Sequence, residues 1–256
     1  MKYLRLRAIA LSGLMGALVS YQTLAEPATF DAPLKVAMPI MDDDPDNGIE
    51  HPLVEYVRYW GETNNLDIEI QRLPFKRSIR HAESGLADFH FPLLKSPEID
   101  ERVLPFDYST TRITTVNFVT YTRDGEPLDL SRPEDFRIAT LAGHAKLFPF
   151  LVNEEHSIEG SLMKLKSGRI DAYIFADSGG DPALIEAGLT GIHRELYRTY
   201  DVHAVLPKGG KGGEIDQLLT RIMAGIVPAE LPLAWQPQPY VDWQVHDDEI
   251  PRVVQK

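Results

Sequence analysis

Apolar and polar positions along the chain follow the periods of an α/β protein. Residues 34–39 (LKVAMP) read as a buried strand, and residues 52–60 (PLVEYVRYW) carry apolar side chains on one helical face. Residues 66–73 (LDIEIQRL) alternate strictly, as a strand does, after a break at Asn64 and Asn65. The order strand, helix, strand predicts a parallel crossover.

One helix–turn–strand pattern occurs twice. In each copy a helix ends at Ser-Gly, and a strand begins after an Asp that stands three positions beyond the glycine. Glycine suits the left-handed position that ends a helix. The copies are PFKRSIRHAESGLADFHF in residues 74–91 and GSLMKLKSGRIDAYIF in residues 160–175. Two similar α/β lobes would explain the repetition.

Two long extended runs surround the second copy and predict crossing strands between the lobes. They are ITTVNFVTYT in residues 113–122 and TYDVHAVLPKG in residues 199–209. A final helix in GGEIDQLLTRIMAGI and a proline- and tryptophan-rich surface tail from Val227 would follow. The predicted lobe boundaries are 26–121 with 202–256 for the first lobe, and 122–201 for the second.

The first 25 residues are typical of a secretory signal peptide. Lys2, Arg5 and Arg7 precede a short apolar run, and small residues lead to an expected cut after Ala25. A retained membrane anchor is the alternative. We expect export to the periplasm. The chain has no cysteine, which excludes a lipoprotein anchor, thiolate chemistry and cysteine-based metal sites.

The formal charge is −12, and loss of the three signal-peptide cations would take it to −15. So acidic a surface disfavours nucleic acid and anionic lipid as partners. It does not exclude an anionic ligand, because one local cation can dominate a closed site.

Motifs of catalysis and cofactor binding are weak. The sequence has no Gly-x-Ser-x-Gly elbow, no P-loop, no dinucleotide fingerprint and no His-Glu-x-x-His. The loop MDDDPDNG carries acids at 42, 44 and 46, but Asn47 replaces the turn glycine of a calcium loop and Leu53 replaces its glutamate. The segment therefore fits a calcium loop less well than a solvated acidic loop, or a loop at the mouth of a cleft that repels or recruits charged ligands. We predict no cofactor and no metal.

The segment DERVLPFDYS, residues 100–109, gives the most specific resemblance to a known family. It resembles the extracellular solute-binding proteins of ABC importers, of the polar amino acid type, and the resemblance covers nearly the whole mature chain. It implies a two-lobed type 2 periplasmic-binding-protein fold. It also implies that Arg102 clamps a ligand carboxylate under aromatic cover from Tyr108. A structural salt bridge from Arg102 to Asp107 or Glu101 is the alternative.

Three further segments carry the resemblance and suggest other ligand-binding residues. PEDFRIATLAGHAKLFPFL implies a helix start at Gly143 and His144 whose N–H groups bind an anion. SGRIDAYIFAD implies that Asp177, one residue later than usual, binds the ligand ammonium. LPFKRSIR implies a ligand-facing Arg77, with a helix-surface role as the alternative. The segment LKSPEI before Arg102 lacks the family's usual carboxylate-binding residues, His144 replaces the usual Thr or Ser, and Asp177 is shifted. A different small carboxylate or a modified amino acid therefore fits equally well.

The resemblance implies a monomeric periplasmic receptor that captures a small zwitterionic or anionic solute for an ABC permease in the inner membrane. A first alternative is an enzyme on the same fold, like the cyclohexadienyl dehydratases, with His144 or Glu101 as the general acid or base. A second is a ligand sensor that serves a signalling receptor. The sequence does not identify the ligand.

Overall fold

The computed structural model describes residues 32–41 and 50–242, so the predicted signal peptide (1–25) and acidic loop (42–46) lie outside the described residues. The strands are β1 (Leu34–Pro39), β2 (Ile68–Leu73), β3 (Phe89–Lys95), β4 (Phe106–Tyr108), β5 (Thr114–Arg123), β6 (Ile138–Leu141), β7 (Asn153–Glu155), β8 (Ala172–Ala176) and β9 (Ile192–Pro207). The α-helices are α1 (Pro52–Asn64), α2 (Phe75–Glu83), α3 (Ile158–Lys166), α4 (Asp177–Glu186) and α5 (Glu214–Gly225). None of these helices is long and apolar enough to span a membrane. The short 3-10 helices are η1 (Glu101–Val103), η2 (Pro133–Asp135), η3 (Ala145–Leu147), η4 (Pro228–Glu230) and η5 (Leu233–Trp235).

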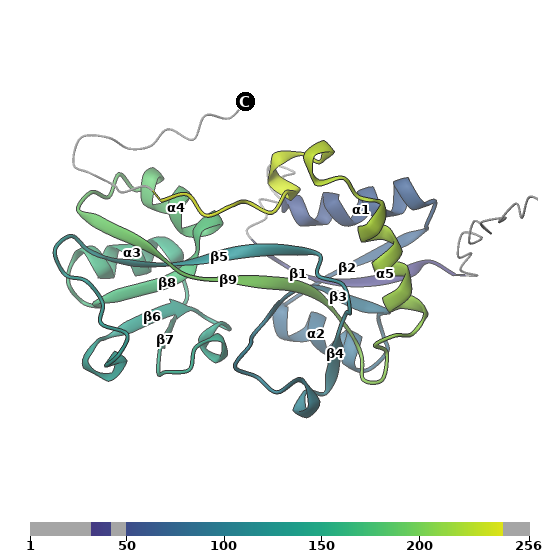
Figure 1. Cartoon of the computed structure of the whole chain (residues 1–256), viewed down its shortest axis with the longest axis horizontal. Helices are drawn as coiled ribbons and strands as arrows, with labels where there is room; N and C mark the ends of the chain where they lie inside the picture. Colours follow the sequence, from purple (N-terminus) through teal and green to yellow (C-terminus); the bar gives the residue numbers. More distant parts are fainter. Residues whose placement is uncertain (1–31, 42–49, 243–256) are drawn as a thin grey trace, which may run out of the picture.

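The nine strands of the described residues belong to one continuous sheet with the order β2-β1-β3-β9-β5-β8-β6-β7, and β4 also pairs with β9. Strand β1 pairs in parallel with β2 and β3, and β6 pairs in parallel with β7 and β8. The long antiparallel strands β5 and β9 run from one parallel half to the other (Figure 1). This is the predicted two-lobed α/β class with two crossing strands.

Strand β9 is longer than the sequence predicted. It begins at Ile192 and not near Thr199. The extra residues (IHRELYR) are mostly polar or charged, so their apolar pattern is too weak to indicate a strand. Pairing with β5, which continues to Arg123↔Ile192, extends the strand in spite of that composition.

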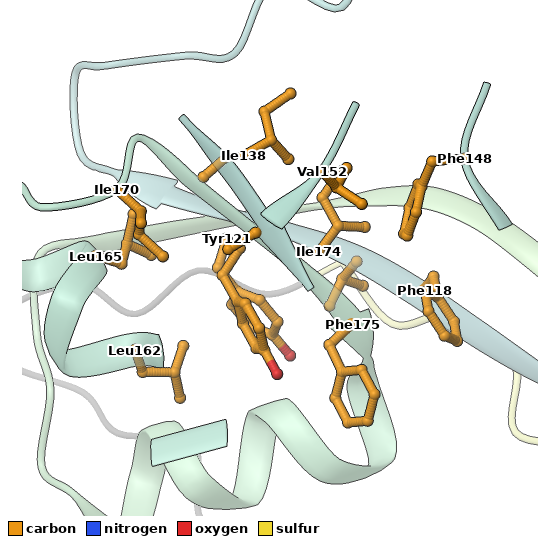
Figure 2. Packing of buried hydrophobic residues seen from close by; sticks show 14 of the residues in the cluster. Phe118, Tyr121, Ile138, Phe148, Val152, Leu162, Leu165, Ile170, Ile174 and Phe175 are labelled. Carbon is orange, nitrogen blue, oxygen red and sulfur yellow. The ribbon is translucent and has the colours of Figure 1, made fainter. Parts of the chain in front are cut away.

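Each half of the sheet has its own apolar core. We call the half with β1–β4, α1, α2 and α5 the first lobe, and the half with β6–β8, α3 and α4 the second lobe. The first core gathers around the fully buried Trp60, whose ring lies 5.0 Å from that of Tyr56. Figure 2 shows the second core, where Leu162 and Leu165 of α3 pack near Tyr121 of β5. Two separate cores allow the lobes to move as units about the crossing strands.

The repeated helix–turn–strand pattern forms as predicted in both lobes. Helix α2 ends before Ser84 and α3 before Ser167, and the glycine that follows each serine has a φ of 73° and 70° respectively. Only glycine adopts this left-handed conformation without a steric cost. Strands β3 and β8 then begin directly after the aspartate of each copy.

The tail after α5 crosses from the first lobe to the second, along the sheet side that bears α1 and α4 (Figure 1). Trp235 stacks on Tyr56 of the first lobe, with 5.4 Å between ring centroids. Tyr240 lies over the guanidinium of Arg194 at 5.0 Å, and Arg194 also donates to the carbonyl of Val241 at 2.7 Å. The tail therefore contacts both lobes, in line with its predicted position along the surface.

His90 gives the fold a defined pH dependence. Its ring is fully buried in β3, and burial lowers its pKa from 6.5 to about 4. Between these pH values the unfolded chain binds a proton that the folded chain does not, so stability decreases as the pH falls from 6.5 to about 4. The loss attributable to this group is roughly 3 kcal/mol. Urea unfolding at pH 7 and pH 4.5 should show a smaller loss in His90→Leu than in the parent chain, and an equal loss in both would contradict the assignment.

Candidate functional site

Sheet topology indicates where a ligand would bind. In open α/β sheets, ligands bind beyond the carboxyl ends of the parallel strands. Three of these ends lead into α2 (after β2), into residues 96–100 (after β3) and into residues 142–148 (after β6). We call the region where these segments meet beside β9 the junction.

The two lobes touch each other at the junction. A Cβ atom added to Gly143, after β6, would lie 3.9 Å from the ring of Phe75, the first residue of α2. Leu94, near the end of β3, packs against the cores of both lobes. The first turn of α2 and the loop after β6 are therefore neighbours in space, although they are far apart in the sequence.

An ion pair connects the first lobe to the crossing strand at this place. Arg198 Nη1 of β9 donates to Glu98 Oε1, beyond β3, at 2.9 Å. The two side chains are 35% and 37% exposed, so both charges remain within reach of solvent. The Arg198 guanidinium also lies 5.8 Å from the ring centroids of Tyr197 and of Tyr200. Aromatic faces hold a guanidinium in place while its N–H groups stay available.

Aromatic side chains of the second lobe form an apolar wall next to this pair. The ring of Tyr197 lies 5.4 Å from Phe148 and 6.2 Å from Phe150. The hydroxyl of Tyr200 donates to the carbonyl of Leu147 at 3.0 Å and so fixes the loop after β6 to β9.

A β-bulge in β9 explains why Arg194 and Arg198 project from opposite faces of the sheet. Phe118 pairs with Arg198 but Val119 pairs with Leu196, so Tyr197 is an extra residue. Without it, Arg194 and Arg198 would lie on one face, because residues four apart in a strand share a face. With it, Arg194 faces the tail and Arg198 faces the opposite, junction side.

Gly143 and His144 lie at the junction, but their local structure differs from the prediction. The expected helix start is only the single 3-10 turn η3, and the Gly143 N–H donates to Glu154 Oε1 at 2.9 Å. His144 packs against Phe175 and Phe118, and burial lowers its pKa. Its Nδ1 lies 3.2 Å from the Leu141 carbonyl, which makes Nδ1 the protonated nitrogen of a neutral ring.

Arg102, the expected carboxylate clamp, lies on the surface of the first lobe. It lies in η1, its side chain is 89% exposed, and its guanidinium binds Asp100 at 2.7 Å. The partners considered in the sequence pair elsewhere, Asp107 with Lys208 and Glu101 with Lys95. A turn at Pro97 and Glu98, directly after β3, leads the chain to the surface before Arg102 is reached.

Tyr108, Asp177 and Arg77 have different surroundings. Tyr108 is buried in the first lobe and donates to the Leu94 carbonyl at 3.0 Å. Asp177 accepts from Asn117 at 3.0 Å, and the same amide donates to the Gln238 carbonyl of the tail. Burial raises the pKa of Asp177. Arg77 is exposed in the first turn of α2, two residues after Phe75.

The structure thus brings Gly143, His144 and the helix start that carries Arg77 to the junction. Arg102 is on the surface, Tyr108 is buried against Leu94, and Asp177 follows β8 but contacts Asn117 on the side of the tail. Sequence reasoning missed Glu98 and Arg198. The available signal was an arginine between two tyrosines, in the segment Tyr-Arg-Thr-Tyr.

No protein-family description matches the sequence, and no curated protein matches it. Solved structures do resemble the fold. The arginine-, lysine-, histidine-binding protein ArtJ from Geobacillus stearothermophilus is 14% identical with a TM-score of 0.57, over 77% of this chain and 90% of that one. The periplasmic VFT2 domain of Bordetella pertussis BvgS is 16% identical with a TM-score of 0.58, over 79% and 91% of the two chains.

A histidine kinase sensor domain similar to periplasmic binding proteins is 17% identical with a TM-score of 0.57, over 75% of this chain and 89% of that one. At these identities the similarity establishes the fold. The chain has the two-lobed fold of type 2 periplasmic binding proteins.

Proposed function

We propose that this chain is a periplasmic solute receptor, which encloses a small zwitterionic or anionic solute between its lobes and delivers it to an ABC permease. The observation that carries the proposal is the junction itself. There the carboxyl ends of two parallel half-sheets meet around a solvent-accessible arginine and glutamate. The fold shared with ArtJ, an amino-acid-binding protein, supports the same reading.

The architecture is suited to closure around a ligand. Each lobe has its own core, and β5 and β9 connect the lobes as a pair of hinge strands. Micromolar binding requires about −8 kcal/mol. Charge-assisted hydrogen bonds of about 1.5–3 kcal/mol each, together with apolar contact against the aromatic wall, are of the right size to supply it.

A thermal-shift screen tests this function. We expect one or more amino acids or small organic acids to raise the melting temperature of residues 26–256 by several degrees at a hundred times Kd, where ligand linkage adds about 2.7 kcal/mol. Stabilisation by none of them would contradict the proposal. Turnover of arogenate or prephenate, followed spectroscopically, would instead support an enzyme on this fold.

A sensor role is the second candidate, supported by the similarity to a histidine kinase sensor domain. The two roles differ in what is lost when the gene is deleted. A receptor for import predicts loss of uptake of the radiolabelled ligand. A sensor predicts intact uptake and loss of the transcriptional response to that ligand.

A further inference from the structure

We propose that Arg198 and Glu98 are the polar recognition groups of the ligand site, and that their ion pair opens when the ligand binds. Arg198 then binds the carboxylate of an α-amino acid, Glu98 binds its ammonium, and the aromatic wall receives an apolar or aromatic side chain. This inference rests on the proposed receptor function and specifies its ligand.

The position of the pair is the first argument. Glu98 belongs to the first lobe, beyond the carboxyl end of β3, and Arg198 lies where β9 leaves the second lobe on its way to the first. A ligand that enters between the lobes would meet both groups. Each side chain is about one-third exposed, so each is accessible without local unfolding.

The chemistry of the arginine is the second argument. Its bond to Glu98 uses one of the five N–H groups of the guanidinium, through Nη1. The planar fork therefore has further donors for a second carboxylate. Contacts with the rings of Tyr197 and Tyr200 would keep the guanidinium in position while the ligand carboxylate replaces Glu98.

Charge balance favours a zwitterion over a simple anion. A monocarboxylate that displaced Glu98 from Arg198 would place two negative charges beside one positive charge. A zwitterion adds one charge of each sign, so both Arg198 and Glu98 regain a partner. A monocarboxylate would leave Glu98 without a positive partner in a partly buried site, and that loss would weaken its binding.

The neighbouring rings give the third argument, on side-chain preference. Phe148, Phe150 and Tyr197 are in mutual ring contact, with centroids 5.4–6.2 Å apart. Such a wall offers apolar contact to the side chain of a ligand. Amino acids with leucine- or phenylalanine-like side chains fit it best.

Calorimetric titration with L-leucine, L-phenylalanine and the deamino analogue 3-phenylpropanoate tests the inference. We expect the parent chain to bind at least one of the two amino acids and to bind 3-phenylpropanoate at least ten times more weakly than L-phenylalanine. Arg198→Gln should weaken amino acid binding at least ten-fold. Glu98→Gln should weaken it too and reduce the preference over 3-phenylpropanoate. Arg102→Gln, which removes an exposed cation, should change affinity less than two-fold.

A charge-swapped chain, Glu98→Arg with Arg198→Glu, separates recognition from a structural role. It should regain the parent melting temperature but not the affinity, whereas a purely structural pair would regain both. Loss of binding in Arg102→Gln with full binding in Arg198→Gln would overturn the inference and leave the receptor function intact. A parent chain that binds only polar or charged amino acids would overturn the side-chain assignment. A parent chain that binds no amino acid or organic acid would overturn the receptor function as well.

Discussion

Replacement of Arg194 by methionine is expected to lower the free energy of unfolding by about 3–5 kcal/mol. Arg194 is 1% exposed, and its Nε and Nη2 bind the two carboxylate oxygens of Asp181 at 3.0 and 2.9 Å. Methionine would leave the Asp181 carboxylate largely buried without its cation, although the Tyr121 hydroxyl would still donate to it at 2.7 Å. The tail would also lose the bond from Arg194 to the Val241 carbonyl and the contact with Tyr240.

Urea unfolding followed by circular dichroism measures this effect, with Arg132→Met as the matched control. Arg132 is 65% exposed and pairs with Asp129 and Asp135 on the surface, so its loss should cost less than about 1 kcal/mol. Adding Asp181→Leu to Arg194→Met should restore much of the stability, because no buried charge then remains unpaired. Equal losses in Arg194→Met and Arg132→Met would show that the buried pair is unimportant.

The sequence predicted the repeated units well because their signals are local. The apolar helix face, the Ser-Gly that ends the helix and the short apolar strand all lie within about twenty residues of sequence. The observed pairs α2–β3 and α3–β8 agree with the prediction made from these signals. Arg194 shows the opposite case. It stands in a polar segment, HRELYR, and is buried only because α4 and a tail nearly fifty residues away cover it. No local pattern contains that information.

The candidate site shows the same division. The loop after β6 and the start of α2 were predicted from local order, and the structure places them together. Arg102 was chosen because of its spacing to Asp107, but the turn after β3 carries it to the surface. Arg198 meets Glu98 across one hundred residues, on a face that depends on a single extra residue, Tyr197, in the pairing of β9 with β5. A one-residue shift in a strand exchanges its faces, and the sequence does not reveal such shifts.

The bulge also relates the two arginine sites to each other. Arg194 fixes β9 to α4 and the tail, while Arg198, four residues later, faces the junction. If Arg198 binds the ligand as proposed, stability and recognition depend on opposite faces of the same strand. In the proposed site, the fixed Arg194 would confine the rearrangement on ligand binding to the Arg198 side chain.

Replacement of Gly180 by alanine is expected to lower the free energy of unfolding by about 2–4 kcal/mol, although alanine is the better helix former. A Cβ atom at this position of α4 would lie 2.3 Å from the hydroxyl oxygen of Tyr121, a ring that points toward the helices in Figure 2. The ring would have to move and give up its hydrogen bond to Asp181.

Two further variants establish the cause of that loss. Gly225→Ala, at the end of α5, meets nothing within 4 Å and should be neutral or stabilising by up to about 1 kcal/mol. Tyr121→Phe removes the atom in closest conflict, so Gly180→Ala should cost less stability in that background than in the parent chain, by a coupling of at least about 1 kcal/mol in a double-mutant cycle. Strictly additive losses would mean that the Tyr121 hydroxyl is not the main obstacle and that the ring carbons, which a Cβ atom at this position would meet at 2.7 and 2.8 Å, account for the loss.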